Sequence, residues 1–243
     1  MLADVVDHAW AEALGCDVGL LRRPGVHLVP GGTRLQGLER VYLARIGDAT
    51  LVSCPPSVRA RAESVLAGLS PAAAFRADTC ARLARTVPSQ VHGPSWHGFV
   101  DPAHVLTPVE GRGRRLPTDH PLLTELRHAC GDDDWAEGGF YFGDDLEEEA
   151  VLVYGIEEQG RLVAAGNLTP FRARPADVGL VTRPEARGRG LATSLTVRMV
   201  TDVLPHVGVV RYRALLTNAP SLRIAASLGF QEHGRSYVAH VHD

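Results

Sequence analysis

The sequence contains no lysine, and all 25 of its basic residues are arginine. This excludes a lysine nucleophile, a lysine Schiff base and a phosphate-binding lysine. The formal net charge of −3 at pH 7 gives no electrostatic case for a nucleic-acid partner, because phosphate-driven binding needs a concentrated basic face. We therefore expect no nucleic acid among the partners.

Cysteines are few, and there is no long apolar run. Cys16, Cys54, Cys80 and Cys130 lie far apart without a C-x-x-C pair, so neither a zinc knot nor a redox couple is indicated. The first seven residues carry acids where a signal peptide needs bases, and no apolar stretch approaches membrane-spanning length. We expect a soluble, cytoplasmic protein without a membrane partner.

Residues 1–105 alternate between helical and strand-like patterns but carry no evident chemistry. The patterns are helical at 5–14, 57–69 and 77–87, and strand-like at 26–29, 41–45, 49–53 and 96–100. We expect an N-terminal α/β domain at 1–105 and a second domain at 106–243. The stretch 107–117 is rich in glycine, proline and arginine, which favours a solvated linker over an entry strand.

The most informative stretch is VGLVTRPEARGRGLA, residues 178–192. Its first five residues, Val178 to Thr182, form a short, mainly apolar run with β-branched residues. Such a run indicates a strand, and Pro184 ends it. From Gly190 onward apolar residues recur near helical spacing until Pro205, so a helix N-terminus falls on residues 187–192. Unpaired amides, the positive end of a helix dipole and two glycines form a cradle for a pyrophosphate. The alternative is an arginine-rich surface turn.

A second punctuated segment, NAPSLRIAASLGF, covers residues 218–230, after a strand pattern at 209–216. With the R-x-x-G-x-A motif at 187–192 and this order of strands and helices, residues 110–243 resemble the GNAT superfamily of acyl-CoA-dependent N-acetyltransferases. The resemblance implies an α/β (α+β) fold with a mixed, mostly antiparallel sheet flanked by helices. We interpret the N-terminal domain as a degenerate copy of the same fold or as a domain that encloses the acceptor site.

The resemblance also implies acetyl-CoA as co-substrate, an amine as acceptor and direct transfer in a ternary complex. We expect no metal, because His240 and His242 have no third ligand in view and the other histidines show no metal spacing. Arg183 or Arg223 would reach a further CoA phosphate. The residues implied in cofactor binding are Leu180, Val181 and Thr182 for the thioester and pantetheine arm, Arg187, Gly188, Arg189, Gly190, Leu191 and Ala192 for the pyrophosphate, and Asn218 from the next strand's end.

The chain departs from that family at one position. Many members carry a tyrosine seven residues after the motif asparagine that protonates the leaving thiolate, and this sequence has Ala225 there. The motif strand, read from Val178, also offers no carboxylate as a base. Ser221 is therefore the candidate for handling the thiol, and Glu137 for relaying a proton through water.

Glu137 belongs to an acidic and aromatic segment, residues 132–149, that would line the acceptor pocket by the same resemblance. Such a rim attracts a cationic amine, whereas the run Glu147–Glu149 fits a solvated loop better.

Three functions are compatible with these residues. The first is an N-acetyltransferase acting on a small amine, an amino-acid derivative or a protein N-terminus. The second is a non-catalytic acyl-CoA-binding or sensing protein that kept the cradle and lost the acid, and the third uses a hydroxyl acceptor. The residues leave the acceptor's identity and the oligomeric state open, a homodimer included.

Overall fold

The computed structural model describes residues 2–31, 39–140, 151–171 and 174–242. Contacts divide the chain into two compact units. Unit 1 comprises Met1–Gly98, Ala214–Ala219 and Glu232–Asp243, and unit 2 comprises Phe99–Arg213 and Pro220–Gln231. The C-terminal strand therefore belongs with the N-terminal residues. The predicted domains 1–105 and 106–243 stay a prediction.

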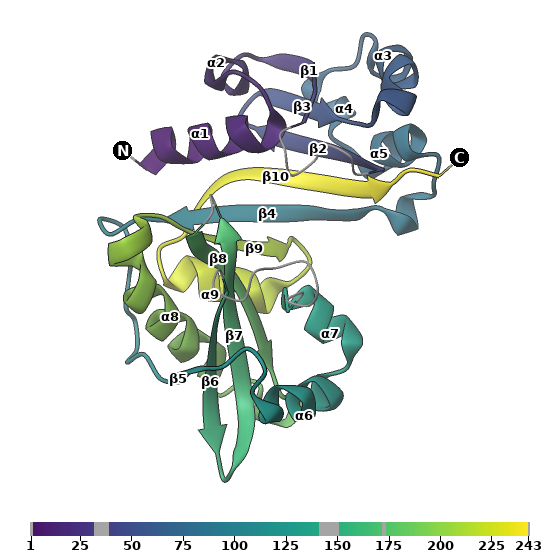
Figure 1. The fold of residues 1–243 in the computed structure, drawn as a ribbon. Helices are drawn as coiled ribbons and strands as arrows, with labels where there is room; N and C mark the ends of the chain where they lie inside the picture. Colours follow the sequence, from purple (N-terminus) through teal and green to yellow (C-terminus); the bar gives the residue numbers. More distant parts are fainter. Residues whose placement is uncertain (1, 32–38, 141–150, 172–173, 243) are drawn as a thin grey trace. The chain divides into compact units, whose positions relative to one another are not determined.

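Unit 1 is built from a sheet and short helices (Figure 1). Its elements are α1 (Leu2–Leu14), α2 (Val18–Leu21), β1 (Gly25–Val29), β2 (Arg40–Ile46), β3 (Ala49–Ser53), η1 (Pro56–Val58), α3 (Arg59–Leu66), α4 (Pro71–Ala74), α5 (Ala77–Ala84), η2 (Pro88–Gln90), β4 (His92–Val100) and β10 (Gln231–His240). Within this unit the strand order is β1-β3-β2-β10-β4. Strand β1 runs parallel to β3, whereas β2 is antiparallel to both β3 and β10.

The core of unit 1 forms between this sheet and helices α3 and α5. Val41 and Leu43 of β2 alternate with less buried residues, and they pack in one cluster with Ala62 of α3 and Leu83 of α5. Alternation along a strand and a three-to-four-residue spacing along a helix place apolar side chains on facing surfaces. The predicted α/β character of the N-terminal part is confirmed.

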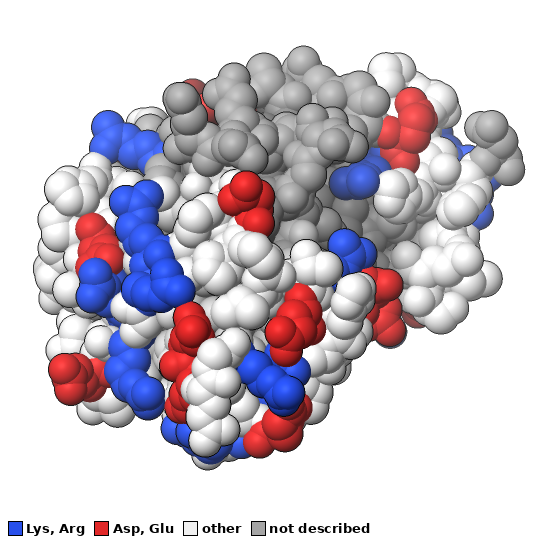
Figure 2. Space-filling view, turned by 60° about the horizontal axis from the view of Figure 1, so that its bottom comes forward, with Lys and Arg blue, Asp and Glu red and all other residues white. Residues whose placement is uncertain are grey.

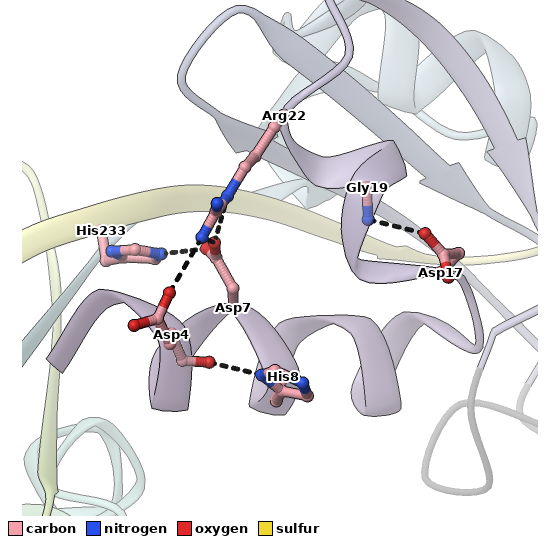
Figure 3. A network of polar contacts seen from close by, with 7 residues as sticks. All are labelled: Asp4, Asp7, His8, Asp17, Gly19, Arg22 and His233. Atoms are coloured by element: carbon pink, nitrogen blue, oxygen red, sulfur yellow. Dashed lines mark hydrogen bonds and ion pairs between the residues drawn. The ribbon is translucent and has the colours of Figure 1, made fainter. Parts of the chain in front are cut away.

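A buried carboxylate ties α1 to other parts of unit 1. Asp7 is almost fully buried, and Figure 3 shows its two oxygens between Arg22, which follows α2, and His233 of β10. Arg22 Nε donates to Asp7 Oδ2 at 2.8 Å, and His233 Nε2 lies 2.7 Å from Asp7 Oδ1. Arg22 also reaches Asp4 at 3.3 Å. The network therefore joins segments that are more than two hundred residues apart in sequence.

Unit 2 carries the motif stretch. Its elements are β5 (Arg114–Leu116), α6 (Pro121–Cys130), α7 (Asp132–Glu137), β6 (Leu152–Glu158), β7 (Arg161–Phe171), β8 (Arg174–Thr182), η4 (Pro184–Ala186), α8 (Leu191–Val207), β9 (Val210–Leu215) and α9 (Ala219–Ser227). The strand order in this unit is β9-β8-β7-β6-β5. From β5 to β8 each strand is antiparallel to the next, whereas β8 and β9 are parallel.

Helices cover both faces of the unit 2 sheet. On one face, a Cβ added at Gly166 of β7 would lie 2.4 Å from the sulfur of Met199 in α8. On the other face, a Cβ added at Gly179 of β8 would lie 2.1 Å from the carbonyl oxygen of Gly138, just after α7. Successive residues of a strand point to opposite faces. Helices α8 and α7 therefore lie on opposite sides of β7 and β8.

Two local expectations were wrong. The stretch favoured as a linker contains strand β5, because Leu116 is buried in the core between the sheet and α6. A single apolar residue among arginines and glycines was too weak a sequence signal for this. Helix α8 also continues past Pro205 to Val207. It ends at Gly208, whose amide donates to the Leu204 carbonyl at 2.9 Å in a left-handed cap.

Candidate functional site

The candidate site is built around the junction of β8 and α8. Strand β8 is antiparallel to β7 along its whole length, which fixes its backbone up to Thr182. Its pairing with β9 is limited to Asp177 opposite Arg211 and Val178 opposite Tyr212. Among the described residues, no strand pairs with this edge of β8 from Gly179 to Thr182. An extended ligand could therefore pair with this edge at Leu180, whereas the Thr182 carbonyl already accepts from Arg187 Nε.

The turn after β8 has the backbone shape that the sequence predicts. Gly188 and Gly190 have φ values of +77° and +74°, and Gly190 is the N-cap of α8. A Cβ added at either glycine would meet no heavy atom within 4 Å. No side chain of the described residues caps the helix at Gly190, so the first amides of α8 could accept an anion. Leu191 is buried and anchors the first turn.

The two arginines of the turn are held by carboxylates of unit 2. Arg187 Nε donates to the Thr182 carbonyl at 3.2 Å, and its guanidinium is ion-paired with Asp134 of α7. Arg189 contacts both oxygens of Glu158 at 2.9 and 2.8 Å. Both arginine side chains are about half exposed. They fix the shape of the turn, and a phosphate there would share or replace their present partners.

Arginines and acidic side chains are interspersed on the face shown in Figure 2. The pairs of unit 2 include Arg114 with Glu157 at 2.9 Å and Arg112 with Glu158 at 3.7 Å. Exposed pairs of this kind contribute little to stability. Each of these arginines has a carboxylate close by that offsets its positive charge.

Arg183, proposed from the sequence for a CoA phosphate, is instead buried in the fold. It donates to the Leu162 carbonyl at 3.1 Å and to Glu125 of α6 at 3.1 Å. Its side chain is 9% exposed, so its guanidinium joins the end of β8 to β7 and α6. This is a structural role. The sequence missed it because Glu125 lies 58 residues away.

The second motif is divided between the two units. Asn218 belongs to unit 1, where its amide donates to the Leu215 carbonyl at 2.9 Å. Helix α9 follows, with Ser221 in its first turn and Ala225 fully buried. The residues of strand β8 and of the turn after it all belong to unit 2, whereas Asn218 belongs to unit 1. Contact between Asn218 and a cofactor stays a prediction.

Tyr212 of β9 is a residue that the sequence reasoning missed. It occupies the last β8–β9 pair, is buried, and shares a side-chain hydrogen bond with Ser221. Burial raises the pKa of the Tyr212 phenol to about 12, although the Ser221 hydrogen bond acts in the opposite direction. The phenol is therefore neutral near pH 7. The alternation of Val210, Tyr212 and Ala214 was the available signal, since it marks one buried face.

A carboxylate on β8 also escaped the sequence reasoning. The strand begins at Arg174 rather than Val178, so it includes Asp177, and the expectation of a strand without a carboxylate was wrong. Asp177 is buried and bonded to the guanidinium groups of both Arg211 and Arg213 at 2.7–3.1 Å. Burial acts to raise the pKa of Asp177, but the two arginines outweigh it and lower the pKa below its ordinary range. This carboxylate is a poor general base.

Helix α7 brings part of the predicted acidic rim to β8. Trp135 stacks with Phe140 at 4.3 Å between ring centroids, and Glu137 is exposed next to Gly138. A Cβ added at Gly138 would lie 2.8 Å from the Leu180 carbonyl oxygen. Glu137 is therefore one residue away from a contact with the motif strand. The rest of the rim, residues 141–149 with the run Glu147–Glu149, lies outside the described residues.

The described part of the chain contains no group of three or more His, Cys, Asp or Glu that could hold a metal ion. All four cysteines are free, and burial raises the pKa of the Cys80 thiol to about 12. None of the described helices is both long and apolar enough to cross a membrane.

These observations define a mixed α/β protein with an open strand edge and a glycine cradle at the start of a helix. Residues 120–230 match the acetyltransferase (GNAT) family. The C-terminal half therefore contains a GNAT acetyltransferase domain, and the predicted fold class is confirmed. The interpretation of residues 1–105 as a degenerate copy of the same fold stays a prediction.

Several solved structures resemble the chain. An acetyltransferase from the GNAT family of Colwellia psychrerythraea is 16% identical, with a TM-score of 0.49, over 63% of this chain and 57% of that one. A putative GNAT-family acetyltransferase from Novosphingobium aromaticivorans DSM 12444 is 22% identical, with a TM-score of 0.46, over 64% and 70%. A GCN5-related N-acetyltransferase-like protein from Streptococcus suis 89/1591 is 14% identical, with a TM-score of 0.45, over 79% and 71%.

The chain thus covers less than two thirds of the Colwellia protein's length. A comparison with curated proteins gives no match.

Proposed function

We propose that this chain binds acetyl-CoA at the β8–α8 junction and transfers the acetyl group to a primary amine of a small molecule or peptide. The observation that carries the proposal is the junction itself. Within the part of the chain that the structure describes, no strand pairs with the outer edge of β8 from Gly179 to Thr182, and β8 leads directly into a turn whose glycines leave room for a ligand. Membership of residues 120–230 in the acetyltransferase family supports the same activity.

The residues at the junction suit the two ends of acetyl-CoA. The amides and carbonyls of Leu180 and Thr182 face away from β7, where a pantetheine arm can add like a further strand, whereas those of Val181 face β7. The turn from Arg187 to Gly190 and the first amides of α8, at Leu191 and Ala192, suit the pyrophosphate. A strand amide can also polarise the thioester carbonyl.

Direct transfer requires the two substrates to be held together. The amine nitrogen attacks the thioester carbonyl carbon, and the C–S bond breaks. The nitrogen loses a proton and the departing thiolate gains one, so the reaction is balanced. An unperturbed alkylamine has a pKa near 10.4, so the site must also accept a proton before attack.

Two side-chain groups are candidates for these proton transfers. Exposed Glu137, beside the contact between Gly138 and β8, is placed to accept a proton through water. The Ser221 hydroxyl, bonded to buried Tyr212 at the point where β8 and β9 separate, is the candidate for contacting the thiol. We propose that Ser221 and Tyr212 together replace the tyrosine that is absent at Ala225.

The alternative function is a non-catalytic acyl-CoA-binding or sensing protein. Two observations favour it. Ala225 is fully buried and apolar where many family members carry the acid, and Asp177 on the motif strand is neutralised by two arginines. Both functions require the same cradle, so binding alone does not separate them.

The first experiment is a calorimetric titration with acetyl-CoA, and with desulpho-CoA as a comparison. We expect micromolar binding of both. Release of free thiol from acetyl-CoA is then measured with a panel of amines. Thiol release that depends on the amine supports the acetyltransferase, whereas binding without it supports the sensing protein. Absence of binding contradicts both.

A further inference from the structure

Asn167 of β7 is a buried side chain without an evident structural function. It is 0% exposed, and within the described part of the chain neither its Oδ1 nor its Nδ2 has a hydrogen-bond partner. Buried side-chain amides are nearly always bonded in folded proteins, and leaving one unbonded is costly. A leucine of similar size would fill the same space at lower cost. Packing alone therefore does not account for an asparagine at this position.

The Asn167 side chain lies against the motif strand. Its cross-strand partner is Gly179, one residue before the strand segment assigned to the thioester. A Cβ added at Gly179 would lie 2.7 Å from Asn167 Oδ1 and 2.8 Å from Asn167 Nδ2. The amide therefore lies across Gly179, in space that only a glycine leaves free. Neighbouring strands are about 4.8 Å apart, so the amide, which lies over Gly179, projects from β7 toward the other edge of β8.

The amide faces the α7 side of the sheet, opposite α8. Gly166, the residue before Asn167, packs against Met199 of α8, and successive side chains alternate between faces. On the α7 side, the backbone of Gly138 and Gly139 lies against Gly179 at this point, and neither glycine has a side chain. This is also the side on which Glu137 and Trp135 are found. The amide is thus on the face proposed for the acceptor rather than for the pyrophosphate.

We propose that the Asn167 carboxamide binds the acceptor, and that the acceptor is an α-amino carbonyl compound such as an amino-acid amide or a peptide N-terminus. This inference depends on the proposed function. Asn167 Oδ1 accepts a hydrogen bond from an N–H of the attacking amine. Asn167 Nδ2 donates a hydrogen bond to the oxygen of the carbonyl group next to the α-carbon. An asparagine side chain does not take up a proton near pH 7, so it orients the amine and leaves deprotonation to another group.

The test uses binding to the non-reactive complex, so that it does not depend on turnover. Protein saturated with desulpho-CoA is titrated with alanine amide and, as a matched compound without the carbonyl, with isopropylamine. We expect alanine amide to bind at least tenfold more tightly to the wild type. In Asn167→Leu we expect this preference to fall to about one, while the Kd for acetyl-CoA stays within twofold.

Thermal stability separates a ligand-binding function from a structural one. Because Asn167→Leu removes two unbonded polar atoms from the interior, we expect its Tm to equal or exceed that of the wild type. Thr169→Val is the control, since it removes a polar group from the same face of the same strand, and it should keep the preference for alanine amide. Where turnover is measurable, Asn167→Leu should lower kcat/KM for alanine amide by at least tenfold.

The possible outcomes are distinct. A lower Tm in Asn167→Leu with an unchanged preference for alanine amide overturns the inference, as does a wild type that shows no such preference. Either result leaves the proposed function intact if the wild type binds acetyl-CoA. Failure of the wild type to bind acetyl-CoA or desulpho-CoA contradicts the proposed function itself and, with it, the inference.

Discussion

The substitution Gly190→Asp tests the cradle directly. The added side chain has room, because a Cβ at Gly190 meets no heavy atom within 4 Å. The φ of +74° costs a non-glycine residue about 1–2 kcal/mol, and an acid at the N-terminus of α8 returns about 0.3–1 kcal/mol. A change of 1 kcal/mol shifts the Tm of a chain of this length by about 2–4 °C. We therefore expect a folded protein with a Tm lowered by about 7 °C or less.

The effect on binding should be much larger. A carboxylate about 4 Å from a phosphate charge is repelled by about 4 kcal/mol at an effective dielectric constant of 20. Screening at an exposed site reduces this to about 3 kcal/mol, which corresponds to about a hundredfold increase in Kd for acetyl-CoA. Calorimetric titration measures it. The defect should shrink as salt is raised to about 1 M, where the Debye length is only about 3 Å.

Gly208→Asp is the matched control for this experiment. Gly208 has a φ of +76°, is equally open, and follows the other end of the same 17-residue helix. At 1.5 Å per residue the two ends are about 26 Å apart. An acid at the C-terminus is repelled by the helix dipole, so the control loses at least as much stability. Its Kd should stay within twofold of the wild type. An unchanged Kd for acetyl-CoA in folded Gly190→Asp, or an equal loss of affinity in both variants, would refute a pyrophosphate site at this turn.

Three further predictions concern Asp177, Asp7 and Tyr212. Because the pKa of Asp177 in the folded protein is below its ordinary value of 3.8, its ion pairs stabilise the fold above that pH, and the contribution is lost as the pH falls below it. Asp177→Asn should therefore lower the free energy of unfolding by about 2 kcal/mol at pH 7 and by less at about pH 3, as measured by urea denaturation; equal losses at both would contradict this.

Asp7→Ala should cost about 2 kcal/mol in the same assay, since it removes the acceptor shared by Arg22 and His233, whereas the half-exposed Asp4→Ala should cost less than 1 kcal/mol. Tyr212→Phe should leave the Kd for acetyl-CoA unchanged and lower amine-dependent thiol release by about a hundredfold, the lower end of the typical contribution of a proton-transferring group; an unaffected rate would remove Tyr212 from the mechanism.

Local sequence was sufficient where the backbone conformation is decided by neighbouring residues. The apolar β-branched run from Val178, the stop at Pro184 and the two glycines predicted the strand, turn and helix of the β8–α8 junction. These features depend on the φ and ψ preferences of consecutive residues, which do not need the rest of the fold. The hairpin of β2 and β3 was predicted for the same reason.

Tertiary structure decided the features that depend on register and on contacts between distant segments. The position of Asn167 opposite Gly179 follows from the pairing of β7 with β8, and a shift of one residue would turn it to the other face. The ion pairs of Asp177 require β9 to lie beside β8. The sequence by itself thus determined the strand, turn and helix at which we propose that an anion binds. Only the folded sheet decided which polar side chains face that place, because strand pairing joins residues that no local pattern relates.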